Sequence, residues 1–483
     1  MNLFRILRNA SFGLIGTFTG IPFQVIAFIL IARNLGSSQF GEYSFAIEYS
    51  LIFSLMADGG LSILSTRELS RHHDSANVYF VNILLLKVLI TAVFYIIMIS
   101  VAYLFHLDTL TLYAVYILGA GNFLCRFSIF IAGVFRAYER MEFEGLLSFV
   151  QAVAFLASIM LVVFVFHQGA DFSLLVWCLF VSYLLPVGIG FYIIKHYLID
   201  LAWKWRIDLV KYFIKEAAPI AIALVLIGTY SRINILVLKA LSTSSELGLF
   251  NVAFRVAFQL CIIPTMLCGA WLPVLSCTYC TEPEQFYWNI SQLNRILLLT
   301  SIPLTVIVFI LASPITLFLY GEAYAPSASS LQVLMGYTFC TFVSFGSKTV
   351  LESCGRQSWW TIALIVGLIV SIGLNLYLVP LRGSVGAAIA TTGACLFTTA
   401  VSLFSMFYFT NWRPQLLVLT RISVSCIVMS FCIYLLKPVS WVLAGVCGGI
   451  IYGFTLIFLR EVDFNEVKLF CRHFFRLTAP EDI

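Results

Sequence analysis

Charged residues are scarce in this chain. Only 11% of its 483 residues are Asp, Glu, Lys or Arg, whereas 61% are hydrophobic, and the mean hydropathy is +1.00. A water-soluble domain carries roughly 25% charged residues, so the composition excludes a soluble globular protein. The net charge of +5 is too small and too scattered to favour a nucleic-acid partner. The chain is therefore expected to be an integral membrane protein.

Recognisable catalytic and metal-binding motifs are also lacking. The sequence has no phosphate-binding G-x-x-x-x-G-K-[ST] loop, no constellation of a nucleophile with its base, and no cluster of metal ligands. Cys277 and Cys280 form a lone C-x-x-C without a second pair or a nearby histidine, which is a weak zinc signal. Most of the 13 cysteines lie in apolar runs, where they act as small packing residues. We expect a transporter, not an enzyme, and no cofactor or metal.

What the sequence does contain is a series of long apolar runs, each near the length of about 20 residues that a membrane-spanning helix needs. The runs lie at about 12–32, 43–64, 78–104, 109–133, 145–166, 172–194, 217–238, 248–275, 295–319, 328–350, 359–379, 385–409, 418–436 and 439–459. They predict an all-α polytopic membrane protein with about fourteen transmembrane helices.

The few charges lie mainly in alternate loops. Of the 28 Lys and Arg residues, 20 fall in the loops of one side, and only Arg33, Lys239, Arg382 and Lys437 fall on the other. Cytoplasmic loops carry the excess of positive charge, so both termini are expected in the cytoplasm.

An internal repeat divides the chain into halves. Residues 32–48 (ARNLGSSQFGEYSFAIE) align with residues 238–255 (LKALSTSSELGLFNVAFR) when one residue is inserted, so that Gly41 matches Gly248. We expect a six-helix bundle at 1–216 and a second at 217–410, related by a pseudo-two-fold axis along the membrane normal. Residues 411–483 would add two transmembrane helices and a cytoplasmic tail. A basic and aromatic stretch at about 195–216 predicts an amphipathic cytoplasmic linker between the halves.

Ionisable residues within the apolar runs are candidates for function, because a charge at membrane depth is costly. The basic ones are Lys87, Arg126, Arg232 and Arg255, and the acidic ones are Glu48 and Asp58. The basic excess predicts a cavity that attracts an anion such as a phosphate group. The alternatives are that Arg232 and Arg255 snorkel to the interface and that Asp58 is only a salt-bridge partner. Because Glu48 and Arg255 align in the repeat, they could also form a gate between the halves.

Five loop sequences, taken in their order, carry a resemblance to a known family. They are ARNLGSSQFGEYSFA from residue 32, RELSR (67–71), GVFRAYERM (133–141), LESCGR (351–356) and VPLRGSVGAAIAT (379–391). In sequence and placement they are similar to the bacterial O-antigen and polysaccharide flippases. That family is the polysaccharide transporter branch of the multidrug, oligosaccharidyl-lipid and polysaccharide exporter superfamily.

The resemblance implies a two-bundle fold with a central cationic cavity. The implied substrate is an undecaprenyl-pyrophosphate-linked oligosaccharide, such as the repeat unit of an O-antigen in lipopolysaccharide. It would move from the cytoplasmic to the periplasmic leaflet of the bacterial inner membrane by alternating access, driven by an ion gradient. Membrane lipids would be further partners, and the flippase could act beside a polysaccharide polymerase and a chain-length regulator.

The resemblance fixes no substrate-binding residue, so the roles come from the charges themselves. We expect Lys87, Arg126, Arg232 and Arg255 to bind the pyrophosphate, and Glu48 and Asp58 to serve in ion coupling or gating. Two other functions stay open. A multidrug or metabolite antiporter of the same superfamily would be expected to have twelve spans and an acidic cavity. A membrane polysaccharide polymerase or ligase would be expected to have a sizeable exterior loop.

Overall fold

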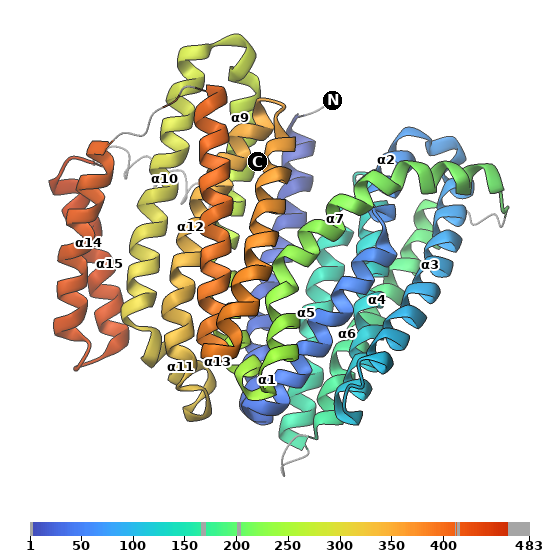
Figure 1. Ribbon diagram of the computed structural model, residues 1–483. Helices are drawn as coiled ribbons and strands as arrows, with labels where there is room; N and C mark the ends of the chain where they lie inside the picture. Colours follow the sequence, from blue (N-terminus) through green and yellow to red (C-terminus); the bar gives the residue numbers. More distant parts are fainter. Residues whose placement is uncertain (1–2, 166–170, 200–203, 411, 413–415, 462–483) are drawn as a thin grey trace, which may run out of the picture. The chain divides into compact units, whose positions relative to one another are not determined.

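The computed structural model describes residues 3–165, 171–199, 204–410, 412 and 416–461 (Figure 1). Side chains of residues 3–18, 223, 231, 280, 416 and 417 are outside the description, so Cys280 of the C-x-x-C motif falls outside it, as does the tail expected beyond residue 461. Within these ranges every regular element is a helix and no strand occurs. In a hydrocarbon layer a helix satisfies all of its own backbone hydrogen bonds. The predicted all-α membrane fold is confirmed.

The described helices form two compact units, Met1–Asn251 and Val252–Ile483. Unit 1 contains α1 (Leu3–Asp58), α2 (Leu61–Arg71), α3 (Ala76–Leu104), α4 (Thr109–Ala137), α5 (Met141–Val165), α6 (Phe172–Ile193), α7 (Ile207–Leu241) and the start of α8 (Ser244–Leu260). Short helical turns lie at His73–Ser75 and Ile194–Leu198. This division falls inside α8, and the boundary expected at residue 216 stays a prediction.

In unit 1, α1 is the central helix, which packs against α3, α4, α5 and α7. The aromatic residues of neighbouring helices fill the interior: Phe80 of α3 stacks on Phe130 of α4 with ring centroids 5.5 Å apart, and Phe213 of α7 is fully buried. Lipid tails are as apolar as these side chains, so helix association in a membrane depends on close packing and polar contacts more than on the hydrophobic effect.

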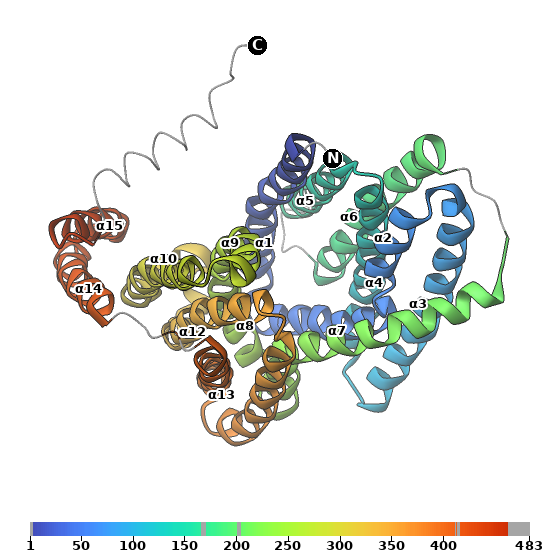
Figure 2. The same ribbon diagram turned by 90° about the horizontal axis from the view of Figure 1, so that it is seen from above.

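Unit 2 contains the rest of α8, then α9 (Ile262–Thr281), α10 (Pro283–Ile310), α11 (Ala312–Tyr320), α12 (Ser327–Ser353), α13 (Gln357–Thr410), α14 (Leu416–Leu436) and α15 (Trp441–Phe458), with a 3₁₀ turn at Glu322–Tyr324. Helix α12 packs against α9, α10 and α13. Helices α14 and α15 lie side by side and pack against α10, at the edge of this unit (Figure 2).

Eleven described helices are long and apolar enough to cross a membrane, or twelve when the two parts of α7, bent by 51°, count as one span. Two of these segments, Thr19–Arg71 and Gln357–Thr410, have 53 and 54 residues, which is about 80 Å of helix against a hydrocarbon core of about 30 Å. Each turns back at a glycine with positive φ, Gly36 (68°) or Gly383 (52°) (Figure 1). Two crossings for each would agree with the expected total of about fourteen.

Candidate functional site

The second half of α1 carries three acidic side chains, at increasing distance from Gly36. The first is Glu42, the second Glu48 and the third Asp58, the last residue of the helix. Each carboxylate has a basic partner on another helix. These pairs are therefore the residues from which a candidate site can be built.

Asp58 pairs with Lys87 in the core of unit 1. Helix α1 ends at Asp58 because the two glycines that follow adopt positive φ, and α2 begins at Leu61. The Lys87 ammonium donates to the Asp58 carboxylate, and it also donates to Ser62 Oγ at 3.2 Å. Ser62 in turn donates to Asp58 Oδ1 at 2.5 Å. The pair agrees with the alternative that Asp58 is a salt-bridge partner of an intramembrane cation.

Lys87 is the most deeply buried of the predicted substrate-binding residues. Its side chain has 0% exposure, and the rings of Phe127 and Phe130 lie 5.7 and 5.5 Å from its nitrogen. Separating a buried ion pair is costly, because each charge would then be buried without a partner. In this conformation Lys87 offers no surface to a ligand, and its expected contact with a pyrophosphate stays a prediction.

Arg126 of α4 is only partly buried and lies near this pair. Its Nε donates to Ser54 Oγ of α1 at 3.4 Å, and its charge acts electrostatically on Lys87. Two cations, Lys87 and Arg126, thus lie near one carboxylate, Asp58, which leaves a local excess of one positive charge. That excess is what an anion would need for binding.

Glu48 pairs with Arg232 of α7. The Glu48 carboxylate lies 3.1 Å from Arg232 Nε, and the two side chains are 19% and 23% exposed. Arg232 also donates to the carbonyl of Gly228 at 3.1 Å. The observed partner of Glu48 thus lies in unit 1, whereas the repeat alignment had matched Glu48 with Arg255.

Arg255 lies in unit 2, on α8, and is partly buried. Its positive charge favours the ionised form of Tyr320 at the end of α11, although burial outweighs this effect and raises the pKa of Tyr320 to about 12. Arg255 thus acts on a buried tyrosine of its own unit, and its predicted role in substrate binding stays a prediction.

A third charged cluster, centred on Glu42, was missing from the sequence-based candidates. Both carboxylate oxygens of Glu42 accept from Lys239 at 2.6 Å, and they also accept from Thr111 and Ser244. Glu42 is 6% exposed. The signal that could have found it is its place directly after Gly41 in the repeated turn.

The two repeated turns themselves pack against each other. A Cβ on Gly41 would lie 1.9 Å from the carbonyl oxygen of Ser244, and one on Gly248 would lie 2.0 Å from that of Ser37. Ser37 and Ser245 are hydrogen-bonded with their hydroxyl oxygens 2.8 Å apart. Only glycine permits this approach. The contact is reciprocal, as expected where a two-fold axis relates two copies of one surface.

At the opposite end of α7, polar contacts join this helix to α2. Arg67 Nη2 lies 2.7 Å from Glu216 and Arg67 Nε lies 3.0 Å from the buried Glu68, which also accepts from Tyr212 at 3.2 Å. Helix α7 is therefore fixed to its neighbours near both of its ends, by the Glu42 cluster and by these residues.

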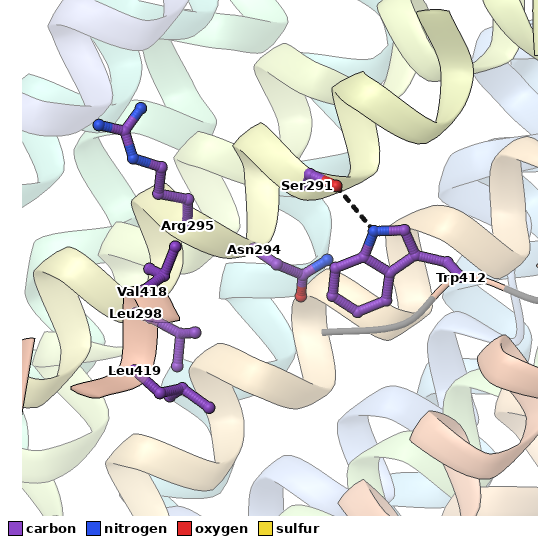
Figure 3. Close-up of a pocket in the computed structure, with 7 residues that line it drawn as sticks. All are labelled: Ser291, Asn294, Arg295, Leu298, Trp412, Val418 and Leu419. Atoms are coloured by element: carbon purple, nitrogen blue, oxygen red, sulfur yellow. Dashed lines mark hydrogen bonds between the residues drawn. The ribbon is translucent and has the colours of Figure 1, made fainter. Parts of the chain in front are cut away.

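A small cavity in unit 2 lies apart from all of these groups (Figure 3). It has a volume of about 30 Å³ and is lined by Ser291, Asn294, Arg295, Leu298, Trp412, Val418 and Leu419. The Trp412 indole donates to Ser291 at 2.8 Å (Figure 3). Such a volume holds about one water molecule, so it is too small for a sugar or a phosphate group.

No metal site is formed by the residues whose side chains the structure describes, since no three His, Cys, Asp or Glu side chains among them lie together. Cys277 of the C-x-x-C motif is exposed, with a free thiol. The charged groups described for unit 1 form ion pairs, with Arg126 as an additional cation beside one of them.

Comparison with known proteins places this arrangement in context. The model of the polysaccharide biosynthesis protein family matches residues 6–278. A probable flippase, AglR, of Haloferax volcanii is 22% identical over 255 residues, which cover 49% of this chain and 52% of the relative. The chain thus matches about half the length of that curated relative.

Two solved structures share the fold. The lipid II flippase MurJ in an inward closed conformation superimposes with a TM-score of 0.75 at 16% identity, over 93% of this chain and 99% of that one. A multidrug resistance transporter of the MATE family, in an inward-facing conformation, superimposes with a TM-score of 0.68 at 14% identity, over 80% and 94%. At these identities the likeness establishes the fold alone.

Proposed function

The chain belongs to the polysaccharide biosynthesis protein family, and from this membership we propose that it is a flippase for lipid-linked oligosaccharides. The substrate is an oligosaccharide attached through pyrophosphate to undecaprenol, such as an O-antigen repeat unit. The observation that carries the proposal is the excess of positive charge around Arg126 in the interior of unit 1. Of the parts of such a substrate, the pyrophosphate is the costliest to move through hydrocarbon.

Arg126 is the group proposed to bind the pyrophosphate. It is partly accessible, its guanidinium suits phosphate oxygens, and the neighbouring Lys87 adds to the positive potential. Arg232 and Arg255 are proposed as further contacts along the path. Because Lys87 is enclosed in this conformation, its direct contact with the anion would require a conformation in which the Asp58 pair is separated.

The proposed transport cycle is alternating access. The positive charge of alternate loops favours a cytoplasmic position for both termini, which would place the turns at 33–42 and 239–248 on the periplasmic side of the inner membrane. There the Glu42–Lys239 pair and the reciprocal Gly41 and Gly248 contacts would form a closed outer gate. Release of the sugar to the outside would require these turns to separate.

Ion coupling is proposed for Asp58 and Glu48. A proton or cation can shift a conformational equilibrium only when it binds one state more tightly than the other. Each carboxylate exchanges an ion for its basic partner, Lys87 or Arg232, when the pair separates. Energy from an ion gradient would enter the cycle at that exchange.

The proposal is tested by replacing Arg126 in cells whose surface polysaccharide depends on this protein. Arg126→Ala should abolish surface display while the protein still reaches the membrane, as measured by immunoblot of membrane fractions, and Arg126→Lys should retain part of it. Arg382→Ala, which removes an exposed arginine elsewhere, is the matched control. Normal display with Arg126→Ala would contradict the assignment, and altered drug susceptibility without a display defect would favour the antiporter.

A further inference from the structure

Residues 204–214, which lead into α7 and form its first turns, present an exposed basic and aromatic surface that the proposed transport cycle does not use. We define this linker surface by Lys204, Trp205, Arg206, Ile207, Lys211 and Ile214, all of which are exposed. Trp205 is 45% exposed, Ile207 59% and Ile214 51%. Large apolar side chains exposed beside cations suggest contact with something both apolar and negatively charged.

The fold holds this segment in place through one buried side chain of α3. The Asn82 amide is fully buried, its Nδ2 donates to the Lys204 carbonyl at 2.7 Å, and its Oδ1 accepts from the Arg206 N–H at 2.8 Å. Both backbone groups that flank Trp205 are therefore bound to the same amide. The backbone that carries the indole and the two neighbouring cations is thus fixed to the core of unit 1.

The first turns of α7 continue the same surface. Phe213 and Ala217 face the core and are buried, so the helical period of 3.6 residues places Lys211 and Lys215 on the opposite face. Ile207 and Ile214 lie along one border of this lysine row. A lysine row bordered by exposed isoleucines is the pattern of a helix that lies in a membrane interface.

We propose that the linker surface binds the headgroups of anionic phospholipids in the cytoplasmic leaflet. Tryptophan is enriched at the headgroup level, where the isoleucines can reach the acyl chains. The cations beside them would then meet lipid phosphates, and each cation near an anionic membrane surface favours binding by about fivefold. The cytoplasmic position rests on the orientation proposed above, whereas lipid selectivity does not require the flippase activity.

The test uses full-length protein in nanodiscs of phosphatidylethanolamine and phosphatidylglycerol. One of the two lipids carries bromine high in its acyl chains, at equal mole fraction in each preparation. The difference in fluorescence between the wild type and Trp205→Phe gives the signal of Trp205. We expect brominated phosphatidylglycerol to quench this signal several-fold more strongly than brominated phosphatidylethanolamine.

The charges are tested by the triple variant K204Q/R206Q/K211Q, in which the ratio of the two quenching constants should fall to about one. The matched control is R356Q/R382Q/K437Q, which removes the same number of exposed cations elsewhere and should keep the wild-type ratio.

Two results would overturn the proposal. Equal quenching by both brominated lipids would mean that the surface lies in the bilayer but does not prefer anionic headgroups. Quenching by neither lipid, with quenching by aqueous iodide, would mean that it faces water or a protein. The measurement involves no transported substrate, so a failure of the flippase assignment would leave its result unchanged, and the two failures are distinguishable.

Discussion

The interiors of the two units differ in chemistry. The described residues of unit 1 include four buried charged side chains, whereas the buried polar groups in the described part of unit 2 are, with one exception, neutral hydroxyl and amide groups. The buried charged side chains among the described residues are Glu42, Asp58, Glu68 and Lys87 in unit 1, and Glu461 in unit 2. That glutamate lies just beyond the end of α15, where Arg295 and Arg421 neutralise it.

Unit 2 satisfies its buried polar groups within and between helices. Thr399, for example, donates to the carbonyl of Cys395 one turn earlier at 2.7 Å and to that of Cys340 on α12 at 3.1 Å. Such neutral groups add packing specificity without titrating. The repeated turns make reciprocal contacts, but the buried polar groups of the two units differ in charge. If Arg126, Asp58 and Glu48 act as proposed, the response to ions and most of the response to the anionic substrate lie in unit 1.

The largest loss of stability should come from breaking the Asp58–Lys87 pair of unit 1. Lys87→Met would leave a carboxylate buried without a partner, which typically costs about 3–5 kcal/mol. We expect a correspondingly lower midpoint in thermal unfolding of the purified protein in detergent. The double variant D58N/K87M should recover most of the loss, because no charge is left alone. If Lys87→Met were as stable as the wild type, the Asp58–Lys87 pair could not be a main source of stability in unit 1.

A smaller effect should follow from neutralising the proposed outer gate. Glu42→Gln keeps the shape of the side chain but leaves Lys239 facing a neutral amide, at a cost of about 1–3 kcal/mol. The turn at Ser245 should then open more often. In a Ser245→Cys background, a membrane-impermeant thiol reagent applied from outside should react faster with the Glu42→Gln variant. An unchanged rate would exclude Glu42 as part of a gate, and Glu322→Gln, at an exposed acid in the turn before α12, is the control.

The smallest effect is expected in unit 2. Thr399→Val keeps the shape and removes two hydrogen bonds to carbonyls that stay bonded within their helices, so the loss should be about 1 kcal/mol or less. Transport should be unchanged, measured by surface display alongside the thermal midpoint. A loss as large as that of Lys87→Met would remove the contrast between the units.

The sequence predicts much of the fold because the segments that lie in the membrane are recognisable by their high hydropathy. The apolar runs predict the helices, the loop motifs predict the family that the comparison confirms, and the repeat identifies two turns that pair in space. Arg126, Asp58 and Lys87 were recognisable because charges at membrane depth are rare.

Which charged side chains pair with each other could not be predicted in the same way. Hydropathy gives the depth of a residue but not the rotation of its helix about the helix axis, and that rotation decides which charges meet. Glu48 therefore meets Arg232, although the repeat suggested Arg255. Glu42 borders a loop, where an acidic residue is ordinary, so its place after Gly41 in the repeated turn is a weak signal. The contact with Lys239 in the fold is what identifies it.

The most direct test of the central claim is flipping by the purified protein in proteoliposomes, with a fluorescent undecaprenyl-pyrophosphate-linked oligosaccharide and a membrane-impermeant quencher. The wild type should equilibrate the lipid between leaflets. The pair S37C/S245C, at positions whose hydroxyl oxygens are 2.8 Å apart, should stop flipping when oxidised and recover when reduced, whereas S37C alone should not respond. Translocation no faster than in protein-free liposomes would contradict the account.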